Sequence, residues 1–129
     1  MEEGLLVLAE QCLEARHYDA ACATFLHLLR RLPTDDFPRR SRISDLLVGA
    51  LHDWGSEADR LNDSSFQLLM KAYHESLDVL SSSALLPNNL GGLLFRLDTD
   101  RQFVLLHICG QFTNLKDHWS KGSQVRTYG

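Results

Sequence analysis

Hydrophobic residues recur at three- and four-residue spacings along the first part of the chain, with polar residues between them. This period predicts two helices, over residues 2–15 and 18–32, because it gathers apolar side chains on one helical face. Only Arg16 and His17 separate the two, so we expect antiparallel neighbours, and Pro33 ends the second. The two apolar faces carry Leu5, Leu8, Ala9, Cys12 and Leu13, then Ala21, Cys22, Phe25, Leu28, Leu29 and Leu32.

Two further helices are predicted in the middle of the chain. Pro38 lies in the intervening loop, and we expect it to delay the third helix until an N-cap at Ser41. Gly55 suits the position after the end of this helix. Residues 61–65 then supply capping residues for a fourth helix over residues 66–80. The apolar face of the third helix carries Ile43, Leu46, Leu47, Ala50, Leu51 and Trp54.

The periodicity is lost over residues 81–92, where serines, a proline, two asparagines and paired glycines predict a loop. A short fifth segment, the apolar stretch LLFRL at residues 93–97, follows, and its periodicity is too short to assign. Thr99 or Asp100 can cap a last helix, which Gly110 closes. No strand alternation is visible, so the predicted class is all-α, a small bundle of about five or six short helices in antiparallel hairpins.

This pattern divides the chain into three predicted parts. Residues 2–97 form a helical interaction domain, and residues 98–110 add a helix that packs on it. Residues 111–129 form a polar, weakly basic and poorly ordered tail.

Composition and charge narrow the class of protein. The 129 residues are 44% hydrophobic and 23% charged, which is an ordinary globular balance. The formal net charge of −4 excludes a chain built as a whole to coat nucleic acid. Three cysteines, an odd number, do not make a disulfide framework, and we interpret them as buried apolar side chains in a reducing compartment. We therefore expect an intracellular protein that does not associate with membranes.

Candidate chemistry is sparse. None of the six histidines falls in a zinc motif, and His107 with Cys109 is the closest approach to a ligand pair. The Asp98–Asp100 segment resembles the start of a calcium loop, but the later ligands are missing, so we interpret it as a helix cap. No serine lies in a nucleophile-elbow turn, and no glycine-rich loop precedes a helix. We expect a protein that is not an enzyme and that uses no cofactor or metal.

One resemblance lies at the start of the chain. Tyr18, Ala21, Phe25, Leu28 and Pro33 fall at the spacings of a second helix and its closing turn in a tetratricopeptide repeat. The stretch resembles one repeat of that family. The resemblance implies a repeat-like adaptor or co-chaperone scaffold that binds a peptide segment.

A second resemblance covers more of the chain. The sequence LAEQCLEARHYDAACATFL is followed by RISDLLVGAL, which contains Leu46 and Leu47, and by SSFQLLMKAYHESLDVL, in which Phe66 and Met70 form an F-x-x-x-M pattern. This order resembles the later helices of the TRF-homology domain of telomere-repeat-binding factors. The resemblance implies a dimerising, telomere- or chromatin-associated protein of the nucleus, with the cytoplasm as the alternative location.

The tail adds a fragment of the same kind. Leu115, Lys116, Asp117 and Trp119 spell the L-K-D-x-W pattern of the DNA-reading helix in the Myb-type domain of those factors. The resemblance implies that Lys116, Asp117 and Lys121 contact telomeric duplex DNA. With so few cations, this contact would be weak for the chain alone.

The apolar face of the fourth helix is the predicted partner-binding surface. It has two interpretations, because residues at helical spacing are usually core and become an interface only where the fold leaves them uncovered. We expect a homodimer or a complex with another helical protein through this face. Two alternatives remain for the function of the whole chain: the peptide-binding adaptor, and a truncated splice product without independent activity. The face consists of Phe66, Met70, Tyr73, Leu77 and Leu80.

Overall fold

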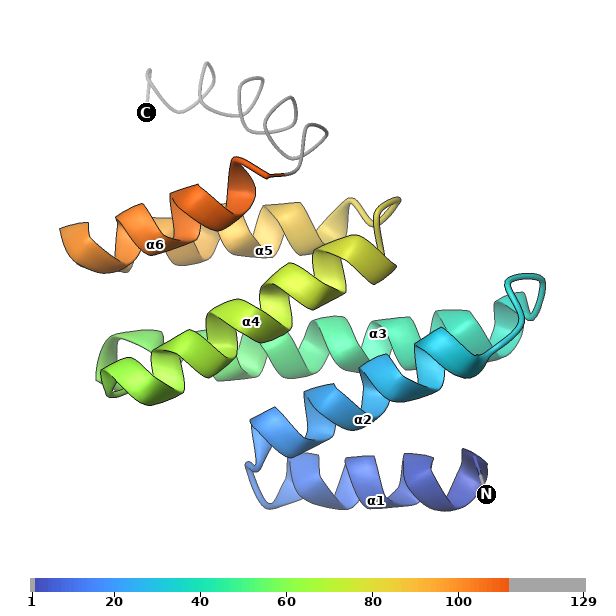
Figure 1. The fold of residues 1–129 in the computed structure, drawn as a ribbon. Helices are drawn as coiled ribbons and strands as arrows, with labels where there is room; N and C mark the ends of the chain where they lie inside the picture. Colours follow the sequence, from blue (N-terminus) through green and yellow to red (C-terminus); the bar gives the residue numbers. More distant parts are fainter. Residues whose placement is uncertain (1, 112–129) are drawn as a thin grey trace. The chain divides into compact units, whose positions relative to one another are not determined.

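The computed structural model of the chain describes residues 2–111 and has an all-α fold, as the sequence predicts (Figure 1). The described residues form six α-helices and one short 3-10 helix, and no strand. In chain order they are α1 (Glu2–Glu14), α2 (Tyr18–Arg31), α3 (Phe37–Gly55), η1 (Ala58–Arg60), α4 (Asp63–Val79), α5 (Leu85–Leu94) and α6 (Thr99–Cys109). Within residues 2–111, none of these helices has the length and apolar character needed to span a lipid bilayer.

The chain divides into two compact units, with the boundary between Ser81 and Ser82. The first unit contains α1 to α4, and the second contains α5 and α6. The predicted division after residue 97 falls within the second unit.

Helix α2 is the centre of the first unit. The four helices run in alternating directions (Figure 1), and α2 packs against α1, α3 and α4, while α3 also packs against α4. Contacts on several sides explain why α2 buries more than the single predicted stripe. Burying one such Leu or Phe side chain contributes about 1.5–3 kcal/mol. The buried side chains of α2 are Ala21, Cys22, Phe25, Leu26, Leu28 and Leu29.

The turn between α1 and α2 uses a left-handed residue that is not glycine. Arg16 has a φ of 62°, and its backbone N–H donates to the carbonyl of Leu13 at 3.0 Å. The next N–H, of His17, donates to the carbonyl of Cys12 at 2.8 Å. This pair of bonds is the Schellman motif, which satisfies the last carbonyls of a helix and favours glycine at the left-handed position. A side chain there carries a steric penalty.

The turn between α2 and α3 corrects one prediction. Helix α3 begins at Phe37 and not after Ser41, because Pro38 lies in its first turn. The first-turn N–H groups of a helix have no intrahelical acceptor, so a proline there sacrifices no hydrogen bond. The N-cap is Asp36, whose carboxylate accepts from the backbone N–H of Arg39 at 3.4 Å.

The far end of α3 corrects a second prediction. Gly55 is the last helical residue and not a left-handed residue beyond the end, and no glycine among the described residues has a positive φ. The C-cap is Ser56, in the right-handed region, and the chain continues into η1. Helix α4 then starts after Asn62, whose side chain accepts from the N–H of Ser65 at 2.8 Å, which agrees with the predicted capping segment.

The second unit corrects a third prediction. Residues 85–94 are helical, although serines, a proline and two glycines suggest a loop for residues 81–92. Pro87 is tolerated because it is the third helical residue, within the turn whose N–H groups have no helical acceptor. Helix α6 begins after Asp98, which lies directly before the expected caps Thr99 and Asp100 and within the segment interpreted as a helix cap. The side chain of Asp98 accepts from the N–H of Arg101 at 2.9 Å.

The left-handed turn gives a stability prediction. We expect Arg16→Gly to be about 1 kcal/mol more stable than Arg16→Ala, because alanine keeps the Cβ that is strained at positive φ. Both variants lose the same exposed ion pair with Glu57, 3.7 Å away, so the comparison cancels it. Urea unfolding followed by circular dichroism measures the difference. Equal midpoints would show that the turn carries no strain.

Candidate functional site

The predicted partner-binding face of α4 lies in the core of the structure. Tyr73 is buried, and its hydroxyl donates to the carbonyl of Leu51 at 3.0 Å. Burial of this kind is the core interpretation that the sequence left open. A contact role for the same residues stays a prediction. Of the five residues, Phe66, Met70, Tyr73 and Leu77 are buried and Leu80 is half-buried.

The predicted DNA-contacting residues, Lys116, Asp117 and Lys121, lie outside the described residues 2–111. The DNA interpretation of the tail therefore stays a prediction.

The described residues bring no set of metal ligands together. No group of three or more His, Cys, Asp or Glu side chains converges within residues 2–111. Within the same range, every buried side-chain nitrogen or oxygen has a hydrogen-bond partner. Asp98 acts as the cap of α6. The buried side-chain polar groups of this part of the chain are thus satisfied within the fold.

The cysteines are unpaired and two are deeply buried. Cys22 and Cys109 are buried, whereas Cys12 is half-buried. Burial and, to a smaller extent, the nearby carboxylate of Asp19 together raise the pKa of the Cys22 thiol from 9.0 to about 12. Burial likewise raises the pKa of Cys109 to about 12. Both thiols are therefore protonated and poorly nucleophilic at neutral pH.

An open pocket lies in the first unit where α1, α2 and α3 meet. Its volume is about 180 Å³. Four aliphatic side chains form its apolar lining: Leu6 from α1, Leu28 from α2, Leu32 just after α2, and Ile43 from α3. The charged lining consists of Glu3 from α1 and Arg39 and Arg42 from α3.

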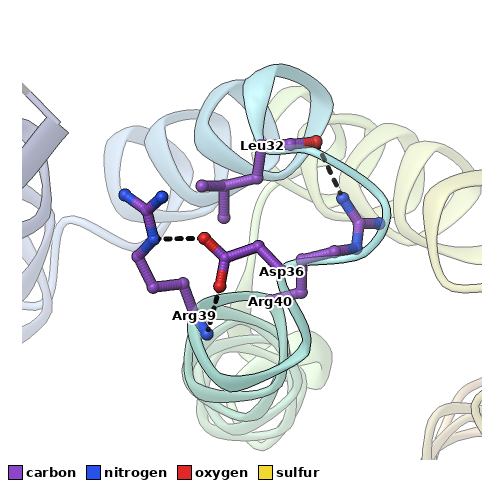
Figure 2. A network of polar contacts seen from close by, with 4 residues as sticks. All are labelled: Leu32, Asp36, Arg39 and Arg40. Carbon is purple, nitrogen blue, oxygen red and sulfur yellow. Dashed lines mark hydrogen bonds and ion pairs between the residues drawn. The ribbon is translucent and has the colours of Figure 1, made fainter.

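The α2–α3 turn positions the arginine side of this pocket (Figure 2). The carboxylate of Asp36 accepts from both the backbone N–H and the side-chain Nε of Arg39, which fixes the direction of that side chain. The guanidinium of Arg40 donates to the carbonyls of Leu29 at 2.8 Å and Leu32 at 3.4 Å. Arg40 therefore closes the end of α2, whereas Arg39 lines the pocket.

The second lining arginine is held more loosely. The Nη2 atom of Arg42 lies 3.4 Å from Oε1 of Glu10 on α1, and the Arg42 side chain is 66% exposed. An exposed ion pair of this kind contributes only about 0–1 kcal/mol. A ligand carboxylate can compete for Arg42 at little cost.

The pocket lies in the most basic part of the chain. Residues 30–42 contain five of the thirteen Lys and Arg residues and only two acidic residues. Arg30 is paired with Glu75, 3.8 Å away, on α4. The run RRLPTDDFPRRSR is visible in the sequence and is the signal that could have located the site. The apolar lining has no such signal, because it comes from three separate helices.

A second surface feature lies on α6. Phe103 and Leu106, one turn apart, are 66% and 44% exposed. Phe95, just beyond the end of α5, is 64% exposed. Large exposed apolar side chains that gather on one element are typical of contact surfaces.

Comparison with known proteins gives no relative: no protein-family model, no curated protein and no solved structure matches this chain.

The cysteine environments predict a two-phase reaction with a thiol reagent such as Ellman's reagent. At pH 8 a thiol of pKa 12 is ionised in about one molecule in ten thousand, so Cys22 and Cys109 react slowly in the folded chain. We expect Cys12 to give the fast phase and Cys12→Ser to abolish it. A fast phase that persists in Cys12→Ser would contradict the burial of the other two.

The same thiols make stability depend on pH in a defined direction. In the folded chain the pKa of both thiols is raised above the ordinary value of 9.0. Their contribution to the free energy of unfolding is therefore fully present below pH 9. It is lost as pH rises towards 12, because the unfolded chain then releases protons that the folded chain retains.

Proposed function

We propose that this chain is a non-enzymatic helical interaction module that docks a segment of another protein in the pocket between α1, α2 and α3. The observation that carries the proposal is the combination of an apolar lining, made by Leu6, Leu28, Leu32 and Ile43, with charged residues beside it. Hot spots of protein interfaces have this form, an apolar anchor that fills a pocket inside a polar rim.

The size of the pocket selects the kind of ligand. Pockets for drug-sized molecules and cofactors have about 300–1,000 Å³, whereas a cavity of about 150 Å³ holds a benzene ring. At about 180 Å³ this pocket fits one large side chain and not a whole cofactor. A peptide segment anchored by a single Leu or Phe satisfies that limit.

The chemistry of the lining supports binding rather than catalysis. Among the described residues, no Ser, Cys or His lines the pocket, and the acidic lining residue, Glu3, is exposed on α1. The lining therefore offers no nucleophile with an adjacent base, the arrangement that covalent catalysis requires.

Blocking the pocket tests the proposal. Leu6 is half-buried, so Leu6→Trp adds bulk at the pocket with little demand on the core. Peptides selected on the wild-type chain from a display library should bind Leu6→Trp about ten- to a hundredfold more weakly, measured by fluorescence anisotropy. Leu8→Trp is the matched control, because Leu8 lies exposed on the same helix and does not line the pocket. Peptides that bind all three proteins equally would refute docking at this site.

Self-association is a second candidate function, and the exposed pair Phe103 and Leu106 on α6 favours it. The resemblance to the TRF-homology domain supports the same role, because that family dimerises. It also supports placing the chain among telomere- or chromatin-associated proteins of the nucleus, with the cytoplasm as the alternative.

Sedimentation equilibrium over a wide concentration range tests self-association. We expect a dimer for the wild-type chain and a monomer for the double variant Phe103→Ser/Leu106→Ser, because two exposed anchors are removed from α6. Leu68→Ser is the matched control, since Leu68 is 48% exposed on α4. A wild-type monomer at all concentrations would exclude this candidate and leave the docking proposal unaffected.

A further inference from the structure

We infer that the docked segment is acidic: one hydrophobic side chain enters the pocket, and Asp or Glu side chains beside it in the segment bind Arg39 and Arg42. This inference rests on the proposed docking function and adds the charge of the partner. In this inference, Arg39 and Arg42 recognise the carboxylates of the segment, and Glu3 opposes their binding.

The two arginines are placed to act together. Arg39 and Arg42 are three residues apart on α3, so they lie on the same helical face, and both line the pocket. A guanidinium presents several N–H donors in a planar fork that matches the two oxygens of a carboxylate. A segment that places its hydrophobic residue against the aliphatic lining therefore brings neighbouring carboxylates to α3.

The existing ion pair of Arg42 permits an incoming carboxylate. Asp36 binds Arg39 through its Nε (Figure 2), and Arg39 is one of the residues that line the pocket. Arg42 is paired with Glu10 only through a loose contact, 3.4 Å long and largely exposed. Exchange of that weak pair for a bidentate contact with the ligand is favourable.

The charge around the pocket acts in the same direction. Arg30 and Arg31 lie at the end of α2, in the same basic run as the lining arginines, while the whole chain carries a net charge of −4. A local positive field attracts acidic segments. The two arginines that line the pocket exceed what one terminal carboxylate needs, so we assign the acids to side chains within the segment and not to a chain terminus.

Glu3 is the group that opposes an acidic ligand. It lines the pocket from α1 and is exposed. Its carboxylate repels any acid that approaches the α1 side, so acidic residues are accepted at the α3 side. Removal of its charge should therefore strengthen binding, an effect that a purely hydrophobic pocket would not show.

The experiment uses acetylated and amidated peptides with a central phenylalanine, flanked on both sides by aspartates, by asparagines or by lysines. Fluorescence anisotropy on the full chain should give the tightest binding for the aspartate peptide, about tenfold over the asparagine peptide at low salt. The lysine peptide should bind most weakly. This preference should shrink in high salt, because the charges are exposed.

Three variants assign the preference to residues. Arg42→Gln should weaken binding of the aspartate peptide about tenfold and leave the asparagine peptide unchanged, and Glu3→Gln should tighten the aspartate peptide about two- to fivefold. Arg60→Gln is the control for Arg42→Gln, because it removes one positive charge from the same unit at an exposed residue outside the pocket. It should leave the binding of all the peptides unchanged. All three sites are exposed, and circular dichroism checks that the fold is kept.

The outcomes separate this inference from the docking function. Equal binding of all three peptides, abolished by Leu6→Trp, would overturn the acidic segment and keep the docking site. No response of any peptide to Leu6→Trp would overturn both. A further asparagine peptide, with a free carboxyl group directly after its phenylalanine, tests whether the bound carboxylate is a chain terminus. If it binds tightest and alone responds to Arg42→Gln, the carboxylate is a chain terminus and the inference is wrong.

Discussion

The first unit depends on the burial of α2. This helix packs against α1, α3 and α4, and side chains such as Phe25, Leu26 and Leu29 are almost completely removed from water. Helices of this length are marginal in isolation, and most of their stability comes from tertiary packing. The other helices of the unit are therefore held in place largely through α2, and the pocket exists because α1 and α3 both lie against its C-terminal half.

The α2–α3 turn connects this core to the proposed binding site. Arg40 binds the last carbonyls of α2, while Asp36 caps the first turn of α3 and also holds Arg39 (Figure 2). One short segment thus ends a helix, starts the next and directs a side chain into the pocket. The polar groups of the turn are used twice, for the fold and for the electrostatics of the site.

Much of the fold was predictable from the sequence, and the misses have physical causes. The periodic stripes located α1, α2 and α4, because one-sided burial leaves its period in the sequence. Pro38 and Pro87 misled the prediction, since each lies in a first helical turn, where a missing N–H does no harm. Gly55 was expected just after the end of α3 but is its last residue, whereas the turn after α1 has Arg16, and not a glycine, in the left-handed conformation. The basic run of residues 30–42 could have been recognised, whereas the convergence of Leu6, Leu32 and Ile43 requires the three-dimensional structure.

The different uses of neighbouring arginines have a consequence for how such a module diverges. Arg40 is committed to backbone carbonyls, so its replacement would alter the scaffold. Arg42, two residues further along the same helix, is exposed and holds only a weak ion pair, so its replacement would leave the scaffold intact. Substitutions at Arg42 can therefore change which partner is bound during evolution, while Arg40, two residues away, keeps the fold the same.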